Sequence, residues 1–353
     1  MLAAQIIKYK DYINNLKSTI NLDERDINNW CDLIELLCLT NPDKEFFRED
    51  LERDIESLVD GGLQLASLKE ISEQMSFDLT DSHIFLTSGR LDWGSNDSAR
   101  NDLLNQLTNM WFSHLQLRQR EFKGFYPFKV EKDGSKIICK PYKKLSKKNK
   151  LYLHLLLTAQ KNGFNKSLQT HLSFDFEPIA FESFKCLIPK KAEAYLLGKG
   201  PYSTARFKKL KHDKFSQLAS ILNIKMKVSI AYFHPKDTGE NGIDFIGWQK
   251  YDNTLPNNSV FAGQATCMSN WSKKYNESSV QEMGGILDTS NVGSYVNSLF
   301  IPYHFKVGRN WAYSTYVDAK NYILFDRFRI LNNLNTRKIN NIIVAEELIK
   351  AIA

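Results

Sequence analysis

The N-terminal third of the chain carries apolar side chains at helical spacing. Apolar residues recur about every 3.6 positions with polar residues between them, as the buried face of an amphipathic helix requires. Candidate caps separate these segments, and Gly61-Gly62 is a stop signal. Helices are therefore predicted over five segments: Ile6 to Ile20, Trp30 to Leu37, Asn41 or Asp43 to Leu58, Leu65 to Met75, and Arg100 to Gln119.

The hydrophobic period changes between Tyr126 and Lys140. Alternating residues flank Asp133-Gly134, and this pattern predicts a β-hairpin because an Asp-Gly pair readily adopts the left-handed backbone of a tight turn. Tyr152 to Ala159 is apolar enough to be a buried helix, with His154 as a packed core histidine. The aromatic residues between Phe174 and Ile188 are interpreted as core.

The second half of the chain has shorter apolar segments. Helices are expected at Lys190 to Leu197, at Lys214 to Leu222, from about Ser269, and at Ile342 to Ile352. Strands are expected at Val228 to Phe233, Ile243 to Trp248, Ser259 to Ala262, Phe300 to Tyr303, and Tyr322 to Phe325. This order predicts an α/β core with a mixed sheet. The chain is thus expected to be α+β, with a mainly helical domain over residues 1–190, hairpin near 125–140 included, and an α/β domain over 191–353.

Length and composition fit a globular protein of two domains. The chain has 353 residues, of which 42% are hydrophobic and 25% charged. It contains no apolar run of the ~18 residues that a membrane span needs, and its N-terminus lacks the apolar region of a secretory leader. The five cysteines are odd in number and form neither a CxxC motif nor a zinc-binding cluster. These features predict a reduced, cytoplasmic protein.

The formal net charge of +7 is unevenly distributed. Nine lysines lie between Lys129 and Lys150, against two acidic residues, and eight basic residues lie between Lys190 and Lys214, against two more. Such basic stretches are suited to phosphate contacts. The alternative interpretation is a solvated surface in a chain that is rich in lysine and asparagine throughout.

The stretch from Gly239 to Lys274 has the strongest chemical pattern. A glycine-bracketed turn leads to Asp244 on one short apolar strand, and a second apolar strand leads to Gln264. Carboxylate and amide oxygens on adjacent strands are ligands that Mg²⁺ accepts, and such ions assist phosphodiester cleavage. The pattern therefore predicts a divalent-metal site at Asp244 and Gln264, with a nearby lysine to orient water or offset phosphate charge.

These residues resemble the PD-(D/E)xK restriction-endonuclease-like nucleases, especially the Mrr-like and phage-defence-associated branches. The family pattern is a helix of the type F-E-x-L, a strand, a G-x-D strand, and an apolar strand that ends in E/Q-x-K. Here Phe215-Ser216-Gln217-Leu218 stands at the helix motif, Gly242-Ile243-Asp244 supplies the aspartate, and Gln264-Ala265-Thr266 follows twenty residues later. Tyr126-Pro127-Phe128 matches a segment in the helical half of similar defence proteins.

The resemblance implies a restriction-endonuclease-like domain with a central mixed sheet and a nuclease that cleaves DNA with Mg²⁺ or Mn²⁺. Asp244 and Gln264 would hold the metal, and Lys274 would assist the water or the phosphate. Two positions depart from the family pattern, because Ser216 replaces the helix acid and Thr266 replaces the lysine. Asp213 is the candidate replacement for the acid, and Lys274, rather than Lys273, for the lysine.

Two functions from different classes remain open on the sequence. The first is the metal-dependent DNA nuclease, acting as an effector or subunit of a bacterial antiphage system beside operon partners such as an ATPase. The second is a non-catalytic DNA- or protein-binding subunit on a degenerate nuclease fold.

Other motifs give weaker signals. Gly198-Lys199-Gly200 lacks the P-loop frame, so nucleotide hydrolysis is not expected. Cys267 has no histidine near it in the sequence to activate it, so a thiol nucleophile is not favoured. The run from Phe325 to Arg329 is compatible with an internal ion pair or a phosphate contact, and the structural ion pair is the favoured interpretation.

Overall fold

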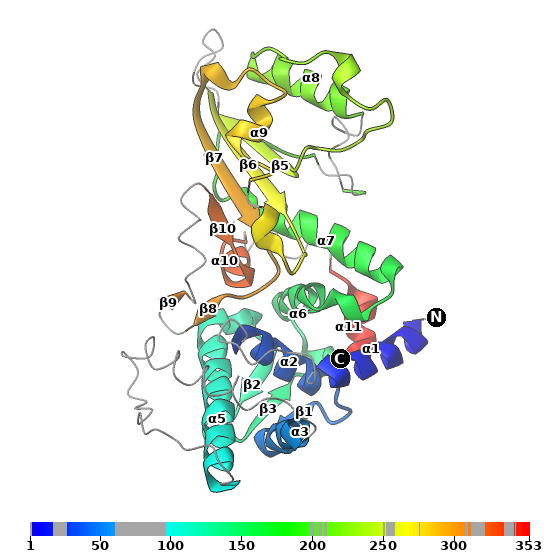
Figure 1. The fold of residues 1–353 in the computed structure, drawn as a ribbon, viewed down its shortest axis with the longest axis vertical. Coiled ribbons are helices and arrows are strands. Elements are labelled where there is room, and N and C mark those ends of the chain that lie inside the picture. Colours follow the sequence, from blue (N-terminus) through cyan, green and yellow to red (C-terminus); the bar gives the residue numbers. More distant parts are fainter. Residues whose placement is uncertain are drawn as a thin grey trace.

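The protein is α+β, with helices packed beside a three-stranded and a five-stranded sheet in this computed structural model (Figure 1). The described residues are 2–16, 27–60, 97–197, 201–202, 204, 207, 210–249, 251, 258–274, 276–307, 310–311, 322–334, 342 and 344–353. The two sheets lie towards opposite ends of an elongated molecule. The predicted helix from Leu65 to Met75 lies outside the described residues. No helix in the described part of the chain is both long and apolar enough to cross a membrane.

Four helices and the smaller sheet form one end of the molecule. The helices are α1 (Leu2–Leu16), α2 (Ile27–Thr40), α3 (Arg48–Asp60) and α5 (Asp97–Phe122). The predicted hairpin is confirmed, because β2 (Phe128–Val130) and β3 (Lys136–Cys139) pair antiparallel around Gly134, whose φ is +70°. An unpredicted strand, β1 (Glu45–Phe47), pairs with the other edge of β3. Helix α3 therefore begins at Arg48, and the predicted start at Asn41 or Asp43 is wrong.

Two long helices cross the middle of the molecule. Helix α6 (Lys147–Ala159) begins with a capping box in which Ser146 and Asn149 each accept a hydrogen bond from the other's backbone N–H. Its His154 is fully buried, as predicted. Helix α7 (Lys166–Phe184) contains the aromatic segment, and its buried residues, Phe176 and Phe184 among them, confirm that this segment is core.

The larger sheet is mixed, as predicted. Its strands are β4 (Glu193–Leu196), β5 (Phe245–Gln249), β6 (Asn258–Ala265), β7 (Val292–Phe300) and β10 (Ile323–Phe325), in the spatial order β10-β7-β6-β5-β4. Strands β4, β5 and β6 are antiparallel neighbours, whereas β6, β7 and β10 run parallel. Side chains along the central strands point alternately to the two faces of the sheet. Each face therefore packs on different helices.

Each face of this sheet has its own helical cover. On one face Phe245 of β5 packs against Phe181 and Phe184 of α7. On the other face Ile246 and Trp248 join a cluster with residues of α8 (Lys211–Leu222) and α9 (Val280–Gly284), which lie beside the sheet in the upper part of Figure 1. The sheet is thus a rigid layer between helices, and the ends of β5 and β6 next to α7 are held from both faces.

The C-terminal segment returns to the helical end of the molecule. Helices α10 (Arg327–Asn332) and α11 (Glu346–Ile352) contribute Ile330 and Ile349 to the same buried cluster as α2 and α6. A small antiparallel ladder of β8 (Lys306–Val307) and β9 (Asn310–Trp311) lies next to α2, which β8 contacts. The predicted division at residue 190 falls in the turn between α7 and β4, and the buried cluster is continuous across it.

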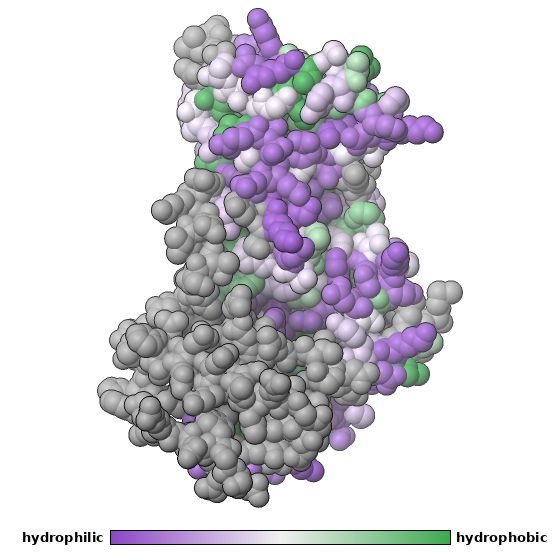
Figure 2. Space-filling model, viewed as in Figure 1, coloured by the Kyte–Doolittle hydropathy of each residue, from purple (hydrophilic) through white to green (hydrophobic). Residues whose placement is uncertain are grey.

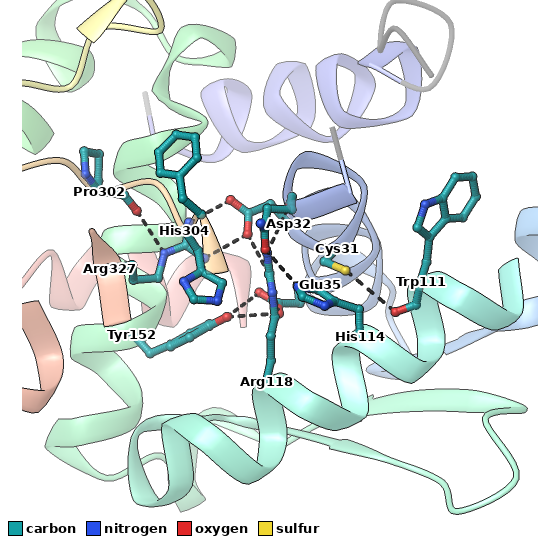
Figure 3. Close-up of polar contacts among 12 residues, drawn as sticks. Cys31, Asp32, Glu35, Trp111, His114, Arg118, Tyr152, Pro302, His304 and Arg327 are labelled. Carbon is teal, nitrogen blue, oxygen red and sulfur yellow. Dashed lines mark hydrogen bonds and ion pairs between the residues drawn. The ribbon is translucent and has the colours of Figure 1, made fainter. Parts of the chain in front are cut away.

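Arg327 makes the ion pair that the run from Phe325 to Arg329 predicted. It donates from Nη1 and Nη2 to the two carboxylate oxygens of Asp32 on α2, at 2.8 and 2.7 Å (Figure 3). Asp326 caps α10 by accepting from the backbone N–H of Arg329. Asp326 and Arg327 therefore both have structural roles.

Four predictions in the second half of the chain are wrong, and one of them is the helix expected from about Ser269, where the described residues form only the 3₁₀ turn Trp271–Lys274. The expected helix at Lys190 to Leu197 is the edge strand β4, and the expected strand at Val228 to Phe233 is a 3₁₀ turn at Ile230–Tyr232. The expected strand at Phe300 to Tyr303 begins where β7 ends. Short apolar runs are compatible with several conformations, and here sheet pairing decides between them.

Candidate functional site

Asp244 and Gln264 face each other across two antiparallel strands. The strand register pairs Phe245 with Gly263, and its continuation by one residue sets Asp244 opposite Gln264. The Asp244 Oδ2 atom accepts a 2.7 Å hydrogen bond from the backbone N–H of Ala265. Both side chains are buried, at 7% and 6% exposure. The sequence prediction that these two residues meet is therefore matched by the geometry.

A tight turn delivers Asp244 to this position. Asn241 and Gly242 are both left-handed, with φ of +54° and +75°, and the backbone N–H of Ile243 donates to the carbonyl of Glu240 at 3.1 Å. Two consecutive left-handed residues are typical of the type I′ turn that an Asn-Gly pair favours. The turn thereby places Glu240 on one side of Asp244 and strand β5 on the other.

Helix α7 adds a third acidic side chain. Phe181 and Phe184 lie 5.6 Å, between ring centroids, from Phe245, the residue after Asp244. Glu177 is one helical turn before Phe181 and so projects from the same face of α7. Gly263 makes this packing possible, because a Cβ there would approach Phe245 Cδ2 to 2.8 Å and Phe184 Cδ2 to 3.1 Å. Close packing of α7 on the sheet therefore carries Glu177 to the strand ends.

The carboxyl groups at this position act on one another electrostatically. Burial raises the pKa of Asp244 well above its usual value, and the negative charges of Glu177, Glu240 and Glu277 raise it further, while the Ala265 N–H lowers it. Burial and the charge of Glu240 raise the pKa of Glu177 to about 7, while Lys214 lowers it. A cluster of like charges that are shielded from water is costly unless a cation joins it, and perturbed carboxyl groups of this kind are typical of functional sites.

Two lysines lie at the border of the acid cluster. The Nζ atom of Lys274, in the 3₁₀ turn Trp271–Lys274, is 2.6 Å from Glu277 Oε1. Lys214 on α8 is buried and donates to the carbonyl oxygens of Leu197 at 3.0 Å and Thr238 at 2.8 Å. Lys273, by contrast, is exposed, which agrees with the choice of Lys274. The usual lysine position holds Thr266, which is buried and brings no charge.

The helical acid whose charge acts on Asp244 is Glu177 on α7, and Asp213 on α8 is not among the charges that raise the Asp244 pKa. Asp213 is exposed and lies 3.3 Å from His212 Nδ1, while Ser216 is exposed on the same helix. Helix α8 also follows β4 in the chain, whereas the family pattern has its helix first. Phe176-Glu177-Pro178-Ile179 has the F-E-x-apolar pattern, lies on α7, and precedes all strands of the sheet. This pattern is not evident from the sequence, because it lies in an aromatic segment that is interpreted as core.

The oxygens at the centre of the cluster suit a hard divalent cation. The Oε2 atom of Glu177 and the Oε1 atom of Gln264 are buried and accept no hydrogen bond. Buried oxygens are normally satisfied, so an additional ligand is a physical explanation for two orphans beside a carboxylate. Mg²⁺ and Mn²⁺ prefer such oxygen donors. No three His, Cys, Asp or Glu side chains of the described residues form a metal-binding group, so a cation here would also need the amide oxygen of Gln264.

The remaining candidate, Cys267, is unsuited to nucleophilic catalysis. Burial raises the pKa of its thiol to about 12, so the reactive thiolate is scarce at neutral pH. Its backbone carbonyl accepts a 3.0 Å hydrogen bond from the Tyr303 hydroxyl. Cys267 is therefore a packing residue.

Comparison with known proteins adds no assignment to this geometry. No protein-family model matches the chain, and neither a curated protein nor a solved structure matches it significantly.

Proposed function

We propose that the protein is a metal-dependent nuclease that cleaves DNA phosphodiester bonds at the cluster formed by Glu177, Asp244 and Gln264. The observation that carries this proposal is the arrival of Glu177 from α7 near Asp244, where its negative charge raises the pKa of the Asp244 carboxyl group. The order α7, β4, β5, β6, with α8 inserted between β4 and β5, is similar to the helix, strand, G-x-D strand and final apolar strand of the restriction-endonuclease-like pattern, although Thr266 stands at its lysine position. As the sequence resemblance suggests, the enzyme would serve as an effector or subunit in bacterial antiphage defence, with partners such as an ATPase.

The proposed reaction assigns a separate task to each side chain. Glu177, Asp244 and the Gln264 Oε1 atom would hold Mg²⁺ or Mn²⁺. When bound, such an ion offsets the charge that grows on the phosphate and acidifies water. The Ala265 N–H fixes the Asp244 carboxylate on its strand. Lys274 supplies positive charge at the border of the site, where it can orient water or contact the scissile phosphate.

Exposed lysines elsewhere are suited to the DNA backbone. Lys132, Lys140, Lys143 and Lys144 are exposed around the hairpin and the start of α6. Other lysines of this stretch are bound in ion pairs, among them Lys136 with Glu45 and Lys150 with Glu346. The face of the molecule seen in Figure 2 is largely hydrophilic over its upper half, which contains the larger sheet. The exposed lysines favour a polyanionic partner through counterion release.

The test is cleavage of supercoiled plasmid DNA in Mg²⁺ or Mn²⁺. Asp244→Asn and Glu177→Gln are each expected to lower the cleavage rate ~100-fold or more, about 2.7 kcal/mol of transition-state stabilisation. Asp213→Asn is the matched control, because that acid is exposed on α8 and should leave the rate unchanged. The proposal fails if the wild type cleaves no DNA in either metal, alone or with its operon partners, or if Asp244→Asn cleaves normally.

The second candidate is the non-catalytic DNA- or protein-binding subunit. It is favoured by the contact of both Gln264 and Lys274 with Glu277, which engages two of the three residues that the sequence assigned to catalysis. In that case Asp244→Asn leaves DNA binding and biological protection intact. Charge reversal of Lys143 and Lys144 abolishes them if the subunit binds DNA.

A further inference from the structure

Glu277 contacts two residues of the proposed reaction centre at once. Its Oε2 atom accepts from the Nε2 amide of Gln264 at 2.7 Å, and its Oε1 atom is 2.6 Å from the Lys274 ammonium. An ionised carboxylate only accepts hydrogen bonds, so its two oxygens match these two donors. Glu277 is part of neither the sequence prediction nor the family pattern.

The contact with Glu277 decides which end of the Gln264 amide faces the site. Only the NH₂ end can donate to a carboxylate, and so the carbonyl end must point the other way. That carbonyl atom, Oε1, is buried and accepts no hydrogen bond. A neutral amide is a metal ligand only through its oxygen. Correct orientation of this side chain is therefore a condition for cation binding.

The segment that carries Glu277 is fixed to the sheet. The Ser278 hydroxyl donates to Asn297 Oδ1 on β7 at 2.6 Å, and the Tyr295 hydroxyl donates to the Ser278 carbonyl at 2.7 Å. Ser279 then caps α9 by accepting from the backbone N–H of Glu282. These hydrogen bonds fix the backbone next to Glu277, so its position does not depend on the contact with Gln264.

The glycine of the Gly242-Ile243-Asp244 turn leaves room for Glu277. A Cβ at Gly242 would lie 2.5 Å from Glu277 Cβ and 2.9 Å from its carbonyl oxygen. Gly242 is also left-handed, at φ +75°. The turn that presents Asp244 is therefore in direct contact with Glu277, which binds Gln264. A side chain at position 242 would clash with Glu277.

We propose that Glu277 is a positioning residue, which holds the Gln264 amide with its oxygen towards the divalent cation and holds Lys274 beside the site. This inference rests on the proposed nuclease function. Second-sphere carboxylates of this kind typically contribute about 10- to 100-fold to metal affinity.

The test exchanges the two side chains and measures Mn²⁺ affinity by calorimetry on the full chain. Glu277→Gln should weaken Mn²⁺ binding about 10-fold or more, because an amide has one acceptor oxygen where Gln264 and Lys274 need two. Combining Glu277→Gln with Gln264→Glu should restore affinity to within about 3-fold. The amide at position 277 can then donate to the carboxylate at position 264 and still accept from Lys274, which leaves one carboxylate oxygen for the cation.

The control and the alternative outcomes separate this inference from the proposed function. Glu282→Gln removes an exposed carboxylate from nearby α9 and should leave Mn²⁺ affinity unchanged. Normal affinity in Glu277→Gln overturns the inference, as does an exchange variant that folds but stays as weak as Glu277→Gln, and in either case a cleaving wild type keeps the proposed function. A wild type that binds neither Mn²⁺ nor Mg²⁺ overturns the proposed function and the inference with it.

Discussion

Glu177 lies at a position where the folded protein disfavours an ionised carboxyl group. Burial and the neighbouring Glu240 raise its pKa to about 7 from the ordinary 4.5. Between these two pH values the folded protein holds a proton that the unfolded chain has lost, so the free energy of unfolding falls as pH rises through this window. Such a residue costs stability at neutral pH, and it is retained where function needs it.

Glu177→Gln is therefore expected to stabilise the metal-free protein at pH 8, whereas the proposed function expects the same substitution to lower cleavage. The expected gain in unfolding free energy is about 1–3 kcal/mol, because the variant no longer loses stability between pH 4.5 and 7. Urea denaturation in a chelator, at pH 5 and pH 8, measures it. Glu182→Gln on the same helix, where the acid pairs with Lys185 near the surface, should change stability by less than about 1 kcal/mol. Destabilisation of Glu177→Gln at pH 8 would contradict this account.

The site residues differ in how far the sequence predicts them. Asp244 and Gln264 follow from two apolar strands, because antiparallel register alone sets their side chains opposite each other. Glu177 had a local signal, the F-E-x-apolar pattern, but its aromatic neighbours favoured a core interpretation. Glu277 has no local signal, since it reaches Gln264 through the anchoring of Ser278 on β7. Contacts of that kind depend on tertiary structure.

At the scale of elements, pairing rather than propensity explains the errors. Residues of β4 read as a helix, yet all four pair with β5 and its Leu196 is buried there. Strand β7 was missed apart from its last residue, because Gly293 and Ser294 interrupt its apolar pattern and only its last four residues are buried. Long periodic segments such as α5 and α8 were predicted correctly, since a stripe several turns long has no comparable alternative.

Through His154, helix α6 makes the stability of the fold depend on pH. The Nδ1 atom of its His154 accepts a 3.1 Å hydrogen bond from the backbone N–H of Ala345, beside α11. Burial, together with the positive charge of Lys147, lowers the pKa of His154 to about 3. The folded protein therefore keeps this histidine neutral, while the unfolded chain binds a proton below pH ~6.5. The unfolded state then holds more protons, so stability is lost as pH falls from about 6.5 towards 3.

His154→Asn is expected to reduce this acid sensitivity. Asparagine retains an acceptor but does not titrate, so the loss of unfolding free energy between pH 7 and pH 5 should be smaller than in the wild type by about 2 kcal/mol. The comparison uses the slope with pH, because the smaller side chain also lowers stability at neutral pH. His171→Asn, at an exposed position on α7, should retain the wild-type slope. Parallel pH profiles for His154→Asn and the wild type would refute the assignment.

Across the whole molecule, one buried polar network connects the two ends of the chain. Arg118 of α5 donates to Asp32 Oδ1 at 2.7 Å and to Glu35 Oε1 at 2.9 Å, while Arg327 of α10 binds both oxygens of Asp32 (Figure 3). The hydroxyl of Tyr152 on α6 donates to Glu35 at 2.8 Å. All of these charged side chains are at most 2% exposed. The network is therefore closed to ligands and structural in role, and it joins residues 295 positions apart.

Removal of Asp32 should consequently destabilise the entire fold. Asp32→Ala leaves two guanidinium groups buried without their shared carboxylate, and loss of one partner from a buried ion pair costs about 3–5 kcal/mol. Asp50→Ala on α3 is the matched control, because its ion pair with Arg53 lies at the surface, with side chains 39% and 73% exposed, and should cost less than about 1 kcal/mol. Chemical denaturation gives both values, and hydrogen exchange should show α2 and α10 losing protection together in Asp32→Ala. Equal, small effects of the two substitutions would mean that packing alone holds the C-terminal segment against the helices.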